Sequence, residues 1–150
     1  NMGQVSRIPG EIIVEVNSNK FRGFNINVGN PHAVVFTDDL TLIGDLKSAP
    51  IVLPTDQYPD GVNVEFVQFL DNGEIMMRVH ERGVGETKSC GTGTCAVAFA
   101  ASIEKNKKLP SKWIINPPGG QLTVEIDAHS NATLTGPAEL VRDIELDKYL

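Results

Sequence analysis

Apolar and polar residues alternate over short runs along most of the chain, which is the pattern of half-buried β-strands. The runs are rich in Val, Ile and Phe, and turn sequences such as Asp71-Asn72-Gly73 and Pro117-Pro118-Gly119-Gly120 separate them. The expected strands are Glu11–Val16, Asn25–Val28, Ala33–Phe36, Val62–Leu70, Glu74–His80, Lys112–Asn116, Leu122–Asp127 and Ala132–Thr135. The pattern predicts a mostly antiparallel curved sheet or barrel.

Two segments depart from this alternation. The first, Thr92–Lys107, has small and apolar residues on every face over Cys95–Ile103, which is typical of a buried helix, and Leu109-Pro110 ends it. The second, Asp38–Leu46, predicts a short surface helix whose apolar face consists of Leu40, Ile43 and Leu46. Strands before and after one buried helix predict an α+β domain in which the sheet wraps around that central helix.

The composition is that of a single globular domain with 150 residues, of which 41% are hydrophobic and 21% charged. A net charge of −6 and the lack of any basic run argue against nucleic acid as a partner. The longest apolar run, Cys95–Ala101, is far shorter than the ~20 residues of a membrane span, and Asn1–Ser6 lacks the features of a secretion signal. We therefore expect neither a nucleic-acid nor a membrane partner.

The two cysteines, in a chain without a visible secretion signal, indicate a reducing compartment, and we expect a cytoplasmic protein. A disulfide between Cys90 and Cys95 is unfavourable because residues five apart on a helix point about 140° away from each other. Cys95 lies inside the apolar helix, so core packing is its expected role.

Candidate chemistry concentrates in the glycine-rich segment Glu81–Cys95, which brings Cys90 to the first turn of the buried helix. A helix N-terminus has unpaired backbone N–H groups and a positive dipole end, so it binds anions and favours a thiolate over a thiol. Cys90 is therefore a candidate base or nucleophile. The amides of Gly91, Thr92 and Gly93 are candidates to hold a carboxylate or a phosphate. Simple packing of a thiol beside a turn explains the same residues, so both interpretations stay open.

A second candidate group lies in Gly29-Asn30-Pro31-His32, where the proline holds Asn30 extended and His32 opens a strand. Both side chains are thereby placed at the end of a sheet. Asn63 shares a strand face with Glu65. The alternative for His32 is a hydrogen-bonded surface position, and for Asn63 a solvent-facing one. We expect no metal, because close ligand-pair spacing is missing from the set Cys90, Cys95, His32 and His80.

Several short motifs occur in one order along nearly the whole chain. They are Gly29-Asn30-Pro31-His32, Asn63-Val64-Glu65-Phe66, Glu81-Arg82-Gly83-Val84-Gly85-Glu86-Thr87, Ser89-Cys90-Gly91-Thr92-Gly93, Pro118-Gly119-Gly120 and Gly136-Pro137-Ala138. Together they resemble the C-terminal half of diaminopimelate epimerases. The resemblance implies a cofactor-independent epimerase that interconverts LL- and meso-diaminopimelate at the α-carbon, in lysine and peptidoglycan biosynthesis.

Enzymes of that family have two similar domains, each contributing one cysteine, and the two cysteines face opposite sides of the α-carbon. A thiolate removes the proton and the opposing thiol returns one to the other face. Carried over by motif, the resemblance implies that Cys90 is one of this pair and that His32 and Glu81 tune the protonation of the cysteines. The substrate-binding residues that it implies are Asn30, Asn63, Glu81 and Arg82, together with the backbone amides of Gly91 and Thr92.

The first half of the family's sequence has no counterpart in this chain. We expect residues 1–150 to form the single C-terminal domain of a two-domain epimerase, with 137–150 as a tail that would cross back to the N-terminal domain. The expected partners are thus diaminopimelate and that domain, and a homodimer of the full-length enzyme stays open. Because Cys95 would lie on the same helix as Cys90, the chain alone is expected to be inactive. His80 stands where family members usually carry Tyr or Trp.

Three alternatives remain. Proline racemases and hydroxyproline epimerases share Cys-Gly-Thr-Gly-Thr, although Glu81-Arg82-Gly83 and Asn63-Val64-Glu65-Phe66 resemble diaminopimelate sites more closely. A carboxylate-binding module without catalysis would need no second cysteine. A thiol hydrolase would use Cys90 as nucleophile and His32 as base, but no third, orienting residue is evident.

Overall fold

The structure, a computed structural model, describes residues 1–139, in which one sheet surrounds the α-helix α1 (Gly91–Glu104). The strands are β1 (Gly3–Gln4), β2 (Ser6–Arg7), β3 (Ile12–Val16), β4 (Asn19–Asn27), β5 (Pro31–Phe36), β6 (Ile51–Leu53), β7 (Asn63–Phe69), β8 (Ile75–Glu81), β9 (Gly85–Thr87), β10 (Ser111–Asn116), β11 (Leu122–Ile126) and β12 (Asn131–Thr135). Two 3₁₀ turns, η1 (Leu40–Ile43) and η2 (Thr55–Gln57), complete the described elements. This confirms the predicted α+β class.

The strand order is β1-β12-β11-β10-β8-β7-β5-β4-β3-β6, with β2 beside β4 and β9 beside β8. The pairs β5–β7 and β10–β8 are parallel, whereas the others within residues 1–139 are antiparallel. Because β1 and β6 end the order without pairing with each other in the described part of the chain, the sheet is open. The prediction of a curved, mostly antiparallel sheet is confirmed, and the barrel alternative is wrong.

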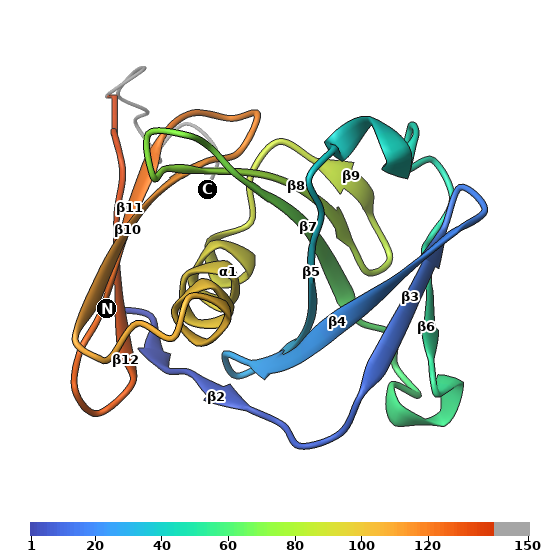
Figure 1. Cartoon of the computed structure of the whole chain (residues 1–150), viewed down its shortest axis with the longest axis horizontal. Helices are drawn as coiled ribbons and strands as arrows, with labels where there is room; N and C mark the ends of the chain where they lie inside the picture. Colours follow the sequence, from blue (N-terminus) through green and yellow to red (C-terminus); the bar gives the residue numbers. More distant parts are fainter. Residues whose placement is uncertain (140–150) are drawn as a thin grey trace, which may run out of the picture.

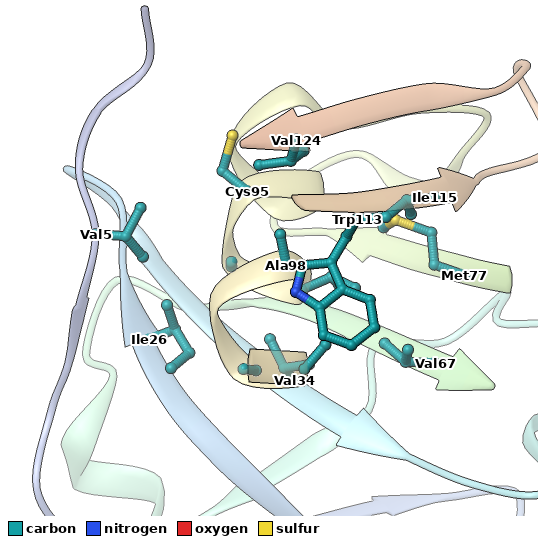
Figure 2. Packing of buried hydrophobic residues seen from close by; sticks show 14 of the residues in the cluster. Val5, Ile26, Val34, Val67, Met77, Cys95, Ala98, Trp113, Ile115 and Val124 are labelled. Carbon is teal, nitrogen blue, oxygen red and sulfur yellow. The ribbon is translucent and has the colours of Figure 1, made fainter. Parts of the chain in front are cut away.

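Helix α1 lies inside the curve of this sheet, with β10, β11 and β12 on one side and β4, β5 and β7 on the other (Figure 1). Residues on all of its faces are buried, which confirms the predicted central helix; they are Gly93, Thr94, Cys95, Ala96, Val97, Ala98, Ala100, Ala101 and Ser102. Figure 2 shows the larger side chains that surround it, among them Val5, Ile26, Val34, Val67, Met77, Trp113, Ile115 and Val124. Small helix residues let the strands approach closely, and the strands supply most of the volume of this core.

A hydrogen-bond cluster fastens the end of α1 to β10. The hydroxyl oxygen of buried Ser102 accepts a hydrogen bond from the indole N–H of Trp113 at 2.8 Å and lies 2.9 Å from the Ser111 hydroxyl. It also donates to the Ala98 carbonyl at 2.9 Å. Because these groups are out of reach of water, each depends on Ser102 for a partner.

Replacing Ser102 by Ala is therefore expected to lower the free energy of unfolding by about 2 kcal/mol, since the Trp113 N–H is left without an acceptor in the core. Urea unfolding followed by the fluorescence of Trp113, the single tryptophan, measures this loss. Exposed Ser48 offers a matched control, and Ser48→Ala should change stability by less than about 0.5 kcal/mol. Equal losses in the two variants would contradict the role of the cluster.

The other face of β3, β4, β5 and β7 covers a second hydrophobic cluster of buried residues: Ile12, Val14, Ala33, Val35, Leu40, Ile43, Leu46, Val52, Val64 and Phe66. The predicted helix over Asp38–Leu46 is only the 3₁₀ turn η1, which Asp39 caps by accepting from the Thr41 amide at 2.8 Å. The chain leaves this turn at Gly44, whose φ of 69° suits glycine. The predicted apolar face is nevertheless confirmed, because Leu40, Ile43 and Leu46 all pack into this cluster.

Four short strands, β1, β2, β6 and β9, and residues 19–24 of β4 were not predicted from the sequence. No helix within residues 1–139 is long and apolar enough to cross a membrane. The predicted tail, 137–150, lies outside the described residues from position 140 onward.

Candidate active site

Cys90 stands immediately before α1 and caps its N-terminus, as the sequence predicts. Its backbone is extended, its sulfur accepts a hydrogen bond from the Gly93 amide at 3.4 Å, and its carbonyl accepts from the Thr94 amide at 2.9 Å. The Thr92 hydroxyl lies 3.6 Å from the same sulfur. The thiol thus occupies the place that a Ser or Asp side chain usually takes at a helix N-terminus.

The turn after β10 supports the loop that carries Cys90. The Gly119 amide donates to the Lys88 carbonyl at 2.7 Å, and a Cβ at Gly119 would lie only 2.9 Å from that oxygen. Only glycine permits this approach, because any side chain would push the two segments apart. The Pro-Pro-Gly-Gly sequence therefore fixes the approach of the chain to Cys90 as well as ending β10.

A series of hydrogen bonds links five residues, which we call the site network: Glu65, His32, Asn30, Thr92 and Cys90. A carboxylate oxygen of Glu65 lies 2.6 Å from Nδ1 of His32, and Nε2 of His32 lies 3.0 Å from the amide oxygen of Asn30. The Asn30 amide nitrogen then donates to the Thr92 hydroxyl at 3.3 Å. The network ends at the Cys90 sulfur.

The parallel pairing of β5 and β7 brings these groups together, because it places His32 beside Asn63 and leaves Glu65 two residues further along the same face. His32 and Glu65 have no solvent exposure, and Asn63 is 4% exposed. The surface alternatives for His32 and Asn63 are therefore wrong. The face is polar because it meets the N-terminus of α1, although it is closed to water.

Asn63 anchors the turn that follows β8. Its amide oxygen accepts a hydrogen bond from the Arg82 backbone amide at 3.0 Å, and the Glu81 carboxylate accepts one from the Thr87 hydroxyl. The exposed Arg82 side chain borders a hollow of about 330 Å³, which buried His80 also lines. The guanidinium is thus placed at a surface that a ligand can reach.

Gly91 and Thr92 form the first turn of α1 and are partly buried beside Cys90. The first N–H groups of a helix have no intrahelical acceptor, so these two amides are not used within α1. The structure thus brings Cys90, Thr92, Asn30 and His32 into one network and joins Asn63 to the Arg82 turn.

Comparison with known proteins identifies the family. The family model described as diaminopimelate epimerase matches residues 24–141. The chain belongs to the diaminopimelate epimerase family. It is 42% identical to the diaminopimelate epimerase of Streptomyces coelicolor over 97% of its own length and 52% of that protein, and 41% identical to that of Parabacteroides distasonis over 86% and 48%. The chain therefore spans about half the length of these curated relatives.

Solved structures of similar fold include a hydroxyproline epimerase from Agrobacterium vitis, with a TM-score of 0.50 and 18% identity over 87% of this chain and 47% of that one. A probable proline racemase from Agrobacterium radiobacter has a TM-score of 0.51 and 18% identity over 87% and 49%. At this identity the likeness extends to the fold alone. It agrees with the sheet wrapped around one helix.

The protonation of Cys90 in this epimerase-family chain differs from the sequence expectation. Burial raises the pKa of the Cys90 thiol above its ordinary value, and the negative charges of Glu65 and Glu81 raise it further. The Thr92 hydroxyl and the Gly93 amide act in the opposite direction but do not outweigh burial. Burial also raises the pKa of Cys95 to about 11, which agrees with its predicted core role. Both cysteines are free thiols.

Glu65, a buried member of the site network, was not predicted from the sequence as a candidate in its own right. A signal was present, because Glu65 and Asn63 interrupt an otherwise apolar strand on a single face. Alternation alone cannot tell a polar face in water from a polar face against a helix end.

Proposed function

We propose that this chain is one half of an epimerase that interconverts LL- and meso-diaminopimelate without a cofactor, in lysine and peptidoglycan biosynthesis in the cytoplasm. The observation that carries the proposal is the Cys90 sulfur at the N-terminus of α1, beside the Gly93 amide and the Thr92 hydroxyl. A sulfur in that place can exchange a proton with a substrate whose carboxylate the same helix end holds.

The reaction needs two groups on opposite faces of the α-carbon. A thiolate on one face takes the α-proton, and the electrons of the C–H bond pass into the adjacent carboxylate. A thiol on the other face then donates its proton to the carbon, so that the two sulfurs exchange protonation states. The free amides of the helix N-terminus stabilise the negative charge that develops on the carboxylate.

The raised pKa of Cys90 supports the thiol as its resting form. In that form Cys90 donates its proton to the α-carbon, while the opposing thiolate removes the proton on the other face. His32 and Glu81 would tune the protonation of the cysteines. Asn30, Asn63, Glu81 and Arg82 would contact the substrate. The amides of Gly91 and Thr92 would hold the carboxylate at the reacting carbon.

The second sulfur has to come from the part of the relatives that this chain does not match. Cys95 does not replace it, because Cys95 is fully buried on the same helix as Cys90. The curated relatives are about twice as long as this chain, which supports a first domain that supplies the opposing cysteine. A chain with one sulfur at the helix N-terminus is expected to lack epimerase activity.

Incubating the chain in deuterated solvent with either LL- or meso-diaminopimelate tests this expectation. Chiral chromatography should show no inversion, because the opposing sulfur is lacking, and proton NMR reports whether the lone Cys90 sulfur exchanges the α-proton on its own face. Measurable inversion by this chain alone would contradict the two-half account. Calorimetry with the same isomers then measures binding. Heat of binding without turnover indicates a half-site that binds substrate alone, whereas no binding indicates that the other domain is needed for binding as well.

A further inference from the structure

Glu65 is the most enclosed charged residue of the site. Its side chain has no solvent exposure, one carboxylate oxygen faces Nδ1 of His32 at 2.6 Å, and the other has no hydrogen-bond partner within the described residues. A Cβ built on Gly93 would lie 2.6 Å from the first oxygen, so the carboxylate rests directly against the start of α1. Nothing in the proposed roles of the other site residues explains why an acid should be buried there.

The hydrogen bonds of the site network have a direction. The Asn30 amide nitrogen faces Thr92, so its oxygen faces His32 and needs a donor on Nε2. With a proton on Nε2, the pair formed by Glu65 and His32 is neutral overall. It consists either of a carboxylate with an imidazolium or of a carboxylic acid donating to bare Nδ1. The Thr92 hydroxyl accepts from Asn30 and is left to donate to the Cys90 sulfur.

The reverse direction is costly. It would require bare Nε2, so that His32 would be neutral with its proton on Nδ1, facing an ionised Glu65. A net negative charge would then be buried, and one of its oxygens would have no donor. Burying an uncompensated charge costs far more than rearranging neutral hydrogen bonds.

We propose that Glu65 is a positioning residue: its buried carboxylate keeps a proton on Nε2 of His32 and so directs the site network toward the Cys90 sulfur. In this arrangement the Thr92 hydroxyl points steadily at the sulfur and stabilises its thiolate form. The inference rests on the proposed function for its catalytic meaning. It also predicts that the effect of Thr92 on the Cys90 sulfur depends on Glu65, and this dependence can be measured without substrate.

A double-mutant cycle measures that coupling. The pH dependence of Cys90 alkylation by iodoacetamide, followed by mass spectrometry of the peptide containing Cys90, is compared in wild type, Thr92→Val, Glu65→Gln and the double variant. In the wild-type background, Thr92→Val should slow alkylation at pH 8 by about fivefold, because the thiolate loses a donor. In the Glu65→Gln background the same change should slow it by less than about twofold, because a Gln side chain permits both directions of the network.

The cycle cancels the direct effect of removing the Glu65 charge on the thiol, and Glu81, the other acid that acts on Cys90, is unchanged throughout. Glu125→Gln serves as the matched control, since Glu125 on β11 is exposed and pairs with Lys112 on β10. In that background Thr92→Val should keep its full effect. Equal effects of Thr92→Val in the Glu65→Gln and wild-type backgrounds overturn the proposal.

Circular dichroism checks that Glu65→Gln folds. Nitrogen-15 NMR of the His32 ring in the wild-type chain provides a second test that needs no variant. A proton on Nε2 is the expected result, whereas bare Nε2 overturns the proposal. Neither measurement uses diaminopimelate, so a failure of the proposed epimerase activity would leave both results interpretable.

Discussion

Gly93→Ala should lower the free energy of unfolding by about 2 kcal/mol, although the same exchange inside a helix usually raises it by about 1 kcal/mol. A Cβ at this position would lie 2.6 Å from a Glu65 carboxylate oxygen and 3.3 Å from the Cys90 sulfur. The carboxylate is fully buried and held by His32, so it has no free direction in which to move. Urea unfolding measures the loss, and the rate of Cys90 alkylation reports the displacement of the sulfur.

Gly91 provides the control for this prediction, since it is only two residues away on the same helix. A Cβ there would meet the Met2 and Leu134 side chains at 3.4 and 3.5 Å, which is ordinary van der Waals contact. Gly91→Ala should therefore leave stability unchanged or raise it by up to about 1 kcal/mol. If the two variants were equally stable, the close approach of Glu65 to α1 would not be a constraint on the fold.

The helix could be predicted from the local pattern because consecutive residues alone show that all of its faces are buried. A helix with small and apolar side chains on every face has no polar face to expose to solvent, so its burial can be predicted without knowing its neighbours. The same local pattern placed Cys90 at the helix start. Both predictions depend on residues within about one helix length of each other, which is why they are confirmed.

The short strands depend on partners far away in the sequence. β1 has two residues and pairs with β12, and β6 has three and pairs with β3. Neither is long enough to show an alternating pattern, so neither could be recognised before its partner was known. For the same reason η1 was predicted as a longer helix, because three apolar positions with helical spacing do not fix the number of turns.

The site was predictable in its residue types but not in its environment. His32 and Asn63 were found by motif, yet their burial follows from the parallel pairing of β5 with β7, which no short motif specifies. The protonation of Cys90 likewise depends on its surroundings in the fold. The sequence shows a helix N-terminus, whereas burial of the thiol raises its pKa against the expected direction, and the charge of Glu65 raises it further.

On the proposed function, Cys90→Ser has the largest expected effect on catalysis, and a chimera with a second half measures it. The proposed two-domain enzyme takes its opposing cysteine from the first half, so we would join this chain to the first half of the Streptomyces coelicolor relative. The whole relative is 42% identical to this chain over 97% of the chain's length. In that chimera Cys90→Ser should lower kcat for inversion by about a thousandfold, because a serine hydroxyl is a far weaker acid than a thiol and donates a proton to the α-carbon much more slowly. The formation of meso-diaminopimelate from the LL-isomer measures the rate.

Solvent exchange at the α-carbon distinguishes loss of one catalytic group from loss of the whole site. In Cys90→Ser the opposing sulfur can still remove and return a proton on its own face, so one of the two isomers should continue to exchange its α-proton for deuterium without inverting. The other isomer presents its proton to residue 90 and should stop exchanging. Cys95→Ala should retain both exchange and inversion, because Cys95 is buried in the core. If both isomers stopped exchanging in Cys90→Ser, that residue would be supporting the site rather than acting on one face of the substrate.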